Sequence, residues 1–378
     1  MSALAKLTAQ LQTRPRRSQI GPIGLHFAED SLHAVQLRRL ASGAYCLRAW
    51  ASVPYRDTRE DLLSSPNRLQ RVTQKLFKEH NFKGHNVVTA MPPEQTRITS
   101  LNFQVDSRKS DAERILHLMG DRLPGPVQDY VIDYLPVRGV PGDKEKVALV
   151  AACAREEIMS LLQTLQQAGL NVQDLDVGPA ALNRLVAELP QGADHRGNVL
   201  LINYGAERTY LTLISGRRLL MDKDVEFGSR MLIEKIVEGL DVDEEFATDI
   251  AERQGLTYAV PTLGESSGTA IDSVNPVVEI LKPTFGRLVD ELRRACLYAA
   301  SESKGDAIDQ VYTFGSIARW AGANELLSEM AGIPVADRLP ITAIFDTDAR
   351  GQAEDFANIG PELAIATGLA LRGLTDDE

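Results

Sequence analysis

Two strand–turn–strand patterns, placed almost half a chain apart, constrain the fold of this sequence more than any other feature. They read IGLHFAEDSLHAVQL, which contains His26, and LINYGAERTYLTLI, which contains Asn203, 177 residues later. In each pattern an apolar strand ends at a polar residue, a small residue follows, and an alternating strand returns. The repetition predicts a duplicated α/β fold with a cleft between two similar halves.

Composition excludes several classes of protein. The chain has 378 residues, of which 44% are hydrophobic and 25% are charged, so it is long enough to bury two or three cores. Its formal net charge of −11 argues against nucleic acid as a partner, because an acidic chain repels the phosphate backbone. Cys46, Cys153 and Cys296 lie far apart and have no metal-binding spacing, which favours a reducing cytoplasm.

No membrane span or signal peptide is expected. The longest apolar runs, such as residues 147–154, are much shorter than the roughly 20 residues that cross a bilayer. The N-terminal segment 1–17 is basic and carries three leucines at helical spacing, so one hypothesis is peripheral contact with anionic lipid. The alternative is a solvated tail, which we favour because three leucines bury little area.

The first half of the chain contains two α/β blocks. From residue 20 to about 90, a strand hairpin is followed by a helix and a further strand. From 91 to 175, three strand patterns have one helix between them and one after them. Ser110 and Glu113 have the spacing of a capping box at the start of the first of these helices. We expect this second block to be a compact insertion.

The second half resumes the alternating pattern at about residue 198. Helical text at 230–256 precedes a Gly-, Ser- and Pro-rich stretch at 257–276, which predicts a long exposed loop. A long helix is expected at about 276–303. One more strand, a glycine turn and a closing helix complete the chain.

The order of these elements resembles the actin-like ATPase superfamily and, more closely, the PilM-type proteins of type IV pilus assembly, including relatives of the MSHA kind. The resemblance covers roughly residues 20–372. The sequence ends in GLTDDE, which does not match the apolar membrane helix of the cell-division actin relative. Its motifs, beyond the two hairpin patterns, are VVTAMPPEQTRITSLNF, VALVAACAREEIMSLLQTLQQAGLNVQDLDVGPAAL, ELRRACLYAAS, VYTFGSIARWAG and ANIGPELAIATGLALRG.

The resemblance implies a duplicated actin-like (ribonuclease H-like) ATPase fold with a small α/β subdomain inserted in the first half. Its segments would be a basic tail at 1–19, subdomain 1A at 20–90, the inserted subdomain 1C at 91–175, a connecting helix at 176–197, and the second half (2A and 2B) at 198–378, whose closing helix returns to 1A.

The resemblance also implies a nucleotide cleft, in which two hairpin turns of the form Asp, any residue, Gly hold phosphates and Mg²⁺. Here the first turn carries His26 and Ala28, and the second carries Asn203 and Gly205, so both acids and one glycine are missing. Asn brings no negative charge to Mg²⁺, and Ala28 has a Cβ where backbone must approach phosphate. ATP hydrolysis is therefore not expected.

The turn that would hold the adenosine side of the nucleotide, residues 314–317, also departs from the family pattern. The family has two or three glycines in a row there, and this sequence has only Gly315. The candidate nucleotide contacts in this degenerate cleft are Asn203, Gly205, Ala206, Gly228, Ser229, Gly315 and Ser316. Plain turn chemistry is the favoured reading of these residues, with weak binding of ATP or ADP with Mg²⁺ as the alternative.

No catalytic residue or metal site is predicted. The six histidines form no HExxH motif and no paired Cys/His spacing. Glu29, Asp30 and Glu207 lie three or four residues past the positions that the chemistry needs, so they are expected to face solvent. His26 is expected to be a partly buried structural residue.

Three functions remain open. The favoured one is a cytoplasmic scaffold, recruited to the inner face of the inner membrane, that docks the cytosolic N-terminal peptide of a PilN-like inner-membrane protein and works with other pilus assembly components. In the PilM-type family this peptide lies against the first half and its insertion. The alternatives are an active actin-like ATPase and an actin-like filament protein held at the membrane by residues 1–17.

Overall fold

A computed structural model gives the architecture. It describes residues 18–104, 109–135, 145–189, 197–216, 218–257, 275–302, 307–335, 338–346, 356–357 and 359–374. The basic segment at 1–17 and positions 258–274 of the expected loop lie outside these residues.

The first half is built on a five-stranded sheet of order β3-β2-β1-β4-β8. β1 and β2 form the expected antiparallel hairpin, in which His26 lies opposite His33. β4 and β8 add in parallel on the other side of β1, because each is reached through a helix rather than a tight turn. The strands are β1 (Gln19–Phe27), β2 (Ser31–Arg39), β3 (Tyr45–Pro54), β4 (Asn86–Ala90) and β8 (Asn171–Asp176).

The second half repeats this order in a four-stranded sheet, β11-β10-β9-β12. β9 and β10 form the second antiparallel hairpin, with Asn203 opposite Tyr210, and β12 runs parallel to β9. The strands are β9 (Asn198–Tyr204), β10 (Thr209–Ser215), β11 (Arg218–Val225) and β12 (Ile308–Gly315). The matching strand orders confirm that the two hairpin patterns open two similar halves.

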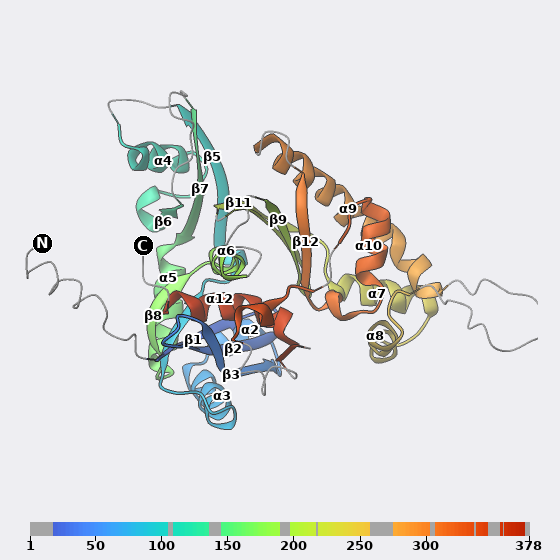
Figure 1. Ribbon diagram of the computed structural model, residues 1–378, viewed down its shortest axis with the longest axis horizontal. Helices are drawn as coiled ribbons and strands as arrows, with labels where there is room; N and C mark the ends of the chain where they lie inside the picture. The colour runs from blue at the N-terminus through green and yellow to red at the C-terminus, as the bar shows by residue number, and fades with distance from the viewer. Residues whose placement is uncertain are drawn as a thin grey trace, which may run out of the picture.

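A third sheet, of order β5-β7-β6, stands beyond the first sheet, at the upper left of Figure 1. The predicted capping box is confirmed at the start of α4, where Ser110 and Glu113 each bond the other's backbone N–H. The elements of this inserted sheet are β5 (Thr96–Gln104), α4 (Asp111–Gly120), β6 (Tyr130–Tyr134) and β7 (Glu145–Ala154).

The chain returns from the inserted sheet to the first sheet through α5 (Arg155–Gln167). Leu161 and Leu165 of this helix lie in the same core cluster as Leu69 and Leu76 of α3 (Pro66–Glu79). β8 then pairs with β4. The segment expected as one insertion, 91–175, therefore contributes to two sheets.

The closing helix α12 (Ala364–Arg372) lies against the first sheet and α6 (Gly178–Glu188) (Figure 1). Glycines allow the close approach: a Cβ on Gly24 of β1 or on Gly368 of α12 would lie 2.0 Å from a facing carbonyl oxygen. Almost every residue of α12 is buried, so this helix is central to the first half.

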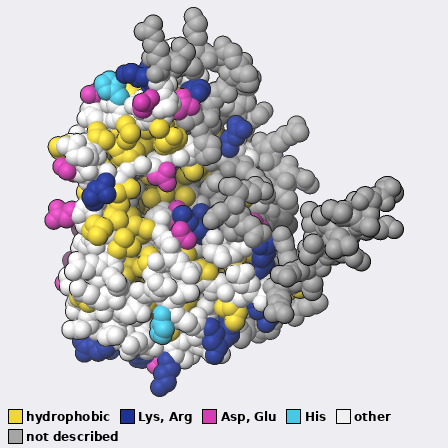
Figure 2. Space-filling model, turned by 90° about the vertical axis from the view of Figure 1, so that its left-hand side faces the viewer, with side chains coloured by type: hydrophobic (Ala, Val, Ile, Leu, Met, Phe, Trp, Pro, Cys, Tyr) yellow, Lys and Arg dark blue, Asp and Glu magenta, His cyan; other side chains and the backbone are white. Residues whose placement is uncertain are grey.

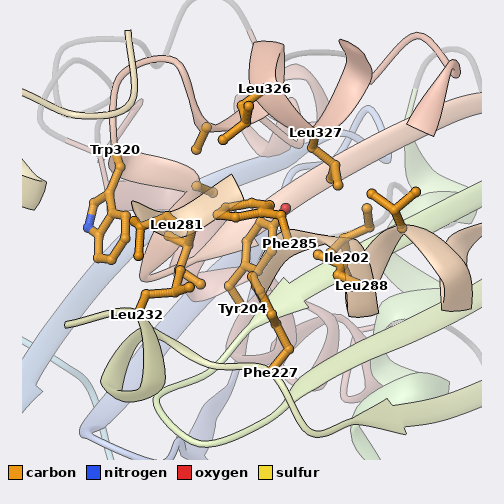
Figure 3. Close-up of a cluster of buried hydrophobic side chains, with 14 of the residues drawn as sticks. Ile202, Tyr204, Phe227, Leu232, Leu281, Phe285, Leu288, Trp320, Leu326 and Leu327 are labelled. Carbon is orange, nitrogen blue, oxygen red and sulfur yellow. The ribbon is translucent and has the colours of Figure 1, made fainter. Parts of the chain in front are cut away.

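Helices of the second half pack on one face of its sheet. The helical stretch expected at 230–256 is two helices, because Asp241 adopts a left-handed conformation that ends the first of them. Figure 3 shows the core between these helices and the sheet, where the ring of Phe227 contacts the rings of Tyr204 and Phe285. The helices are α7 (Ser229–Leu240), α8 (Glu244–Arg253), α9 (Pro276–Glu302) and α10 (Ala323–Ala331).

Among the described residues, no helix combines the length and the apolar character needed to cross a bilayer. Cys46, Cys153 and Cys296 are all free thiols.

Candidate functional site

A cavity of about 620 Å³ lies where the first half, the inserted sheet and the second half meet. Three turns reach it: the first turn (26–30) between β1 and β2, the second turn (203–208) between β9 and β10, and the third turn (314–317) after β12. The start of β5 and the middle of β11 form further parts of its wall.

The structure brings the predicted nucleotide contacts together, in two layers. Five of them reach the cavity, namely Asn203, Gly205, Ala206, Gly315 and Ser316. Gly228 and Ser229 lie behind the second turn, where the N–H of Ser229 donates to the Gly205 carbonyl over 3.1 Å. The seven residues therefore lie near one another around the second turn.

Backbone groups of the second turn are engaged in hydrogen bonds within the turn and with the start of α7. The N–H of Gly205 donates to Arg208 O at 2.9 Å, closing the hairpin. The N–H of Arg230, in the first turn of α7, donates to Ala206 O at 3.0 Å. Two N–H groups at the start of α7 thus donate to carbonyls of the second turn. Free N–H groups at a helix N-terminus commonly bind an anion, but these two are already hydrogen-bonded.

The third turn packs directly on the second. The N–H of Ser316 donates to Tyr204 O at 3.0 Å, and its hydroxyl lies 3.3 Å from both Tyr204 O and Gly205 O. Gly315 has a φ of +91°, and a Cβ on it would lie 2.1 Å from Tyr204 O. Glycine is required here by its conformation and by the close backbone contact.

Glu29 is half-buried, whereas it was expected to face solvent. Its side chain reaches from the first turn to the second, where the Glu207 N–H donates to its Oε2 over 2.8 Å. Burial raises the pKa of Glu29, while backbone N–H groups of Glu207 and Ala206 act in the opposite direction. Asp30 and Glu207 are exposed, as predicted, and Glu207 pairs with Arg230.

Two histidines face each other where the first hairpin meets the cavity. The rings of His26 and His33, which occupy opposite register positions on β1 and β2, have centroids 5.8 Å apart. Burial lowers the pKa of both, that of His33 to about 4, so both imidazoles are neutral at pH 7. The Nδ1 atom of each lacks a hydrogen-bond partner within the described part of the chain. His26 is the partly buried residue that was expected.

Arg59 is a cavity residue that the sequence analysis missed. It opens the short helix α2 (Arg59–Leu63), and only 8% of its side chain is exposed. Its Nη2 donates to Glu94 at 2.6 Å and to Glu60 at 3.1 Å. Its Nη1 is buried and has no hydrogen-bond partner in the described ranges. The run RED on a short helix resembles any solvated surface, so the sequence carried no signal of this burial.

The first half and the inserted sheet line the cavity with both apolar and charged side chains. The apolar ones include Met91, Pro93, Ile98, Tyr130, Ala152 and Ala154, and Arg59, Glu94 and Arg97 are among the charged ones. Asp222 of β11, in the second half, also lines the cavity, and it accepts a hydrogen bond from Thr212 Oγ1 at 2.6 Å. Burial raises the pKa of Asp222 to about 7, and the nearby Asp224 charge acts in the same direction.

No group of three or more His, Cys, Asp or Glu side chains among the described residues could hold a metal ion. The candidate site is thus a cavity lined by hydrogen-bonded turns and by apolar and charged side chains of the first half and the inserted sheet.

Comparison with known proteins identifies the architecture. A family model described as type IV pilus assembly protein PilM matches residues 24–374. A solved PilM–PilN type IV pilus biogenesis complex has 23% sequence identity and a TM-score of 0.73, covering 96% of this chain and all of that chain. The ethanolamine utilization protein EutJ from Carboxydothermus hydrogenoformans has 14% identity and a TM-score of 0.50, covering 98% and 99%. These likenesses confirm the actin-like fold.

Proposed function

The chain belongs to the PilM family of type IV pilus assembly proteins, and from this premise we propose that it is a scaffold that docks the cytosolic N-terminal peptide of a PilN-like inner-membrane protein. The similar solved structure is described as a PilM–PilN complex, which supports this choice of partner. Recruitment from the cytoplasm to the inner face of the inner membrane follows from such docking.

The docking site in this proposal is the cavity wall formed by the first half and the inserted sheet. β5 is an edge strand of its sheet, and its first residues, Thr96, Arg97 and Ile98, line the cavity. An extended peptide can pair with such an edge and place alternate side chains in adjacent apolar space. This edge strand beside the cavity is the observation that carries the proposal. Arg59, whose buried Nη1 has no hydrogen-bond partner within the described part of the chain, lines the same cavity.

The same proposal treats the nucleotide cleft as degenerate. The acids that would organise Mg²⁺ are replaced by His26 and Asn203. Burial lowers the pKa of His26, so it is a neutral imidazole at pH 7, and backbone N–H groups of the second and third turns bond within the chain. A triphosphate with Mg²⁺ would have to break these bonds, and it would gain no carboxylate from the two turns. We therefore assign no hydrolytic activity to the scaffold.

A second surface is suited to other pilus assembly components. Figure 2 shows the side of the molecule on the left of Figure 1, where hydrophobic side chains gather in the upper part. The exposed large hydrophobic residues on elements of that side are Leu116 of α4, Val131 and Tyr134 of β6, and Met159 of α5. β6 is the other edge strand of the inserted sheet, and an open edge with exposed apolar side chains favours association.

The docking proposal is tested by fluorescence anisotropy with a labelled peptide from the N-terminus of the PilN-like protein. Ile98→Glu places a charge on the cavity wall, and we expect it to weaken binding at least tenfold. Leu297→Glu is the matched control, because Leu297 is 73% exposed on α9 of the second half, and it should bind like the wild type. Equal affinity of the two variants would place the peptide elsewhere.

A further inference from the structure

The side chain of Glu29 joins the two halves of the molecule at the second turn. It starts on the first turn and accepts the N–H of Glu207, 178 residues away, at 2.8 Å. The carboxylate lies close against the turn: a Cβ on Gly205 would be 2.5 Å from Glu29 Oε2. Gly205 leaves the space that this carboxylate needs, which gives the glycine a role in the protein without nucleotide.

The chemistry of the contact is that of an anion site. Successive backbone N–H groups in a turn form a concavity that accepts negatively charged oxygens, whether they belong to a carboxylate or to a phosphate. The N–H of Glu207 donates to Glu29 in this way, and the backbone N–H of Ala206 also lowers the pKa of Glu29. The carboxylate thus occupies the position in which an exogenous oxyanion would meet the turn.

No ion pair holds Glu29 in the described part of the chain. Among its electrostatic contacts, Arg59 favours the charged form of Glu29, but Arg59 itself pairs with Glu94 and Glu60. Glu207 acts against the charged form, and burial raises the pKa of Glu29 overall. The contact therefore depends on backbone N–H donors, whose geometry does not require a carboxylate from this chain.

We propose that the second turn is an anion-binding site that the protein fills with its own Glu29 carboxylate, and that removing this side chain opens the site to a small oxyanion such as inorganic phosphate. In the intact protein the carboxylate then keeps the two halves together at the cleft and excludes phosphate groups from the turn. The inference goes beyond peptide docking and does not depend on it.

The test compares Glu29→Ala with Asp30→Ala, which removes the same charge from the adjacent, exposed residue. Hydrogen exchange is followed at the backbone amides of Ala206 and Glu207, first without inorganic phosphate and then at phosphate concentrations that increase in tenfold steps. In Glu29→Ala we expect exchange at both amides to be at least tenfold faster than in wild type. Phosphate should slow it again, whereas wild type and Asp30→Ala should not respond to phosphate.

Glu29→Gln distinguishes loss of the acceptor from loss of the charge, because its amide oxygen can still accept from the turn. In Glu29→Gln we expect the amides of Ala206 and Glu207 to stay protected from exchange, and the effect of phosphate on their exchange to be small. Circular dichroism checks that each variant is folded. Unchanged exchange in Glu29→Ala, or the same phosphate response in wild type and Glu29→Ala, would overturn the proposal. Unaltered binding of the PilN-like peptide by these variants would show that peptide docking stands independently.

Discussion

Gly228 lies so close to Ala206 that a Cβ atom on Gly228 would be 2.2 Å from the Ala206 carbonyl oxygen. The contact presses the start of α7 against the second turn, where the next two residues donate N–H bonds to the same turn. Gly228 was a candidate nucleotide contact. Its position assigns it a packing role that operates without any ligand.

Gly228→Ala should therefore destabilise the protein by about 1–3 kcal/mol, because the added methyl group meets backbone that cannot move aside. Gly286→Ala is the control: nothing lies within 4 Å of a Cβ at this position of α9. Alanine should raise helix stability there by up to about 1 kcal/mol. Urea unfolding followed by circular dichroism measures both, and a Gly228→Ala variant as stable as wild type would refute the packing role.

Asp222 predicts a pH dependence of stability. Its folded-state pKa is raised to about 7, mainly by burial, so the folded protein binds a proton that the unfolded chain releases at lower pH. The stability that this proton contributes is present below the ordinary pKa of Asp and is lost as pH rises through 7. The side chain that Asp222→Asn introduces cannot ionise. The free energy of unfolding of this variant, relative to wild type, should therefore rise by about 1–2 kcal/mol between pH 5 and pH 8.5, after allowing for partial exposure of the site to the cavity.

Denaturant unfolding at several pH values tests this difference. Asp290→Asn removes a carboxylate from an exposed ion pair on α9 and serves as the control. If the gap between wild type and Asp222→Asn stays constant from pH 5 to 8.5, the raised pKa has no effect on folding.

Asp176 connects three elements of the first half. Its carboxylate, with 6% of the side chain exposed, accepts from Arg184 of α6 at 3.1 Å and lies 3.0 Å from Arg372 of α12. Asp176→Asn removes the charge between two arginines and should cost about 3 kcal/mol. Asp249→Asn, which breaks the exposed pair with Arg253, should cost less than about 1 kcal/mol. Similar melting temperatures for the two variants would contradict this difference.

Restoring an acid to the second turn should not restore catalysis. Asn203→Asp supplies one missing carboxylate, but the neighbouring N–H groups remain bonded to the chain and to Glu29. We expect no magnesium-dependent phosphate release above the wild-type background in a coupled assay. Turnover in wild type that Asn203→Asp alters would instead support the active ATPase.

The fold was predictable because its signals are local and repeated. The alternation around His26 and Asn203 marks two hairpins, and Ser110 with Glu113 marks a helix start, so periodicity and short spacings located these elements. The arrangement of two actin-like halves with an insertion was implied by the resemblance to the PilM-type family. Glu29 and Arg59 were not predictable in the same way. Each is placed by residues far away in sequence, Glu29 by a turn 178 residues later and Arg59 by Glu94, and no spacing encodes such contacts.

The candidate site was predictable as a location but not as an arrangement of bonds. Gly205 and Gly315 were identified because the resemblance implies a nucleotide cleft at these turns, and the structure places both at the cavity. Which backbone groups are engaged follows from how the second turn, the third turn and α7 pack together, and that packing appears only in three dimensions.

Calorimetric titration of the wild-type protein with Mg·ATP, and separately with the N-terminal peptide of the PilN-like protein, tests the central claim most directly. We predict heat of binding with the peptide and none with Mg·ATP at concentrations up to about 1 mM. Saturable, magnesium-dependent binding of ATP without binding of the peptide would contradict the account.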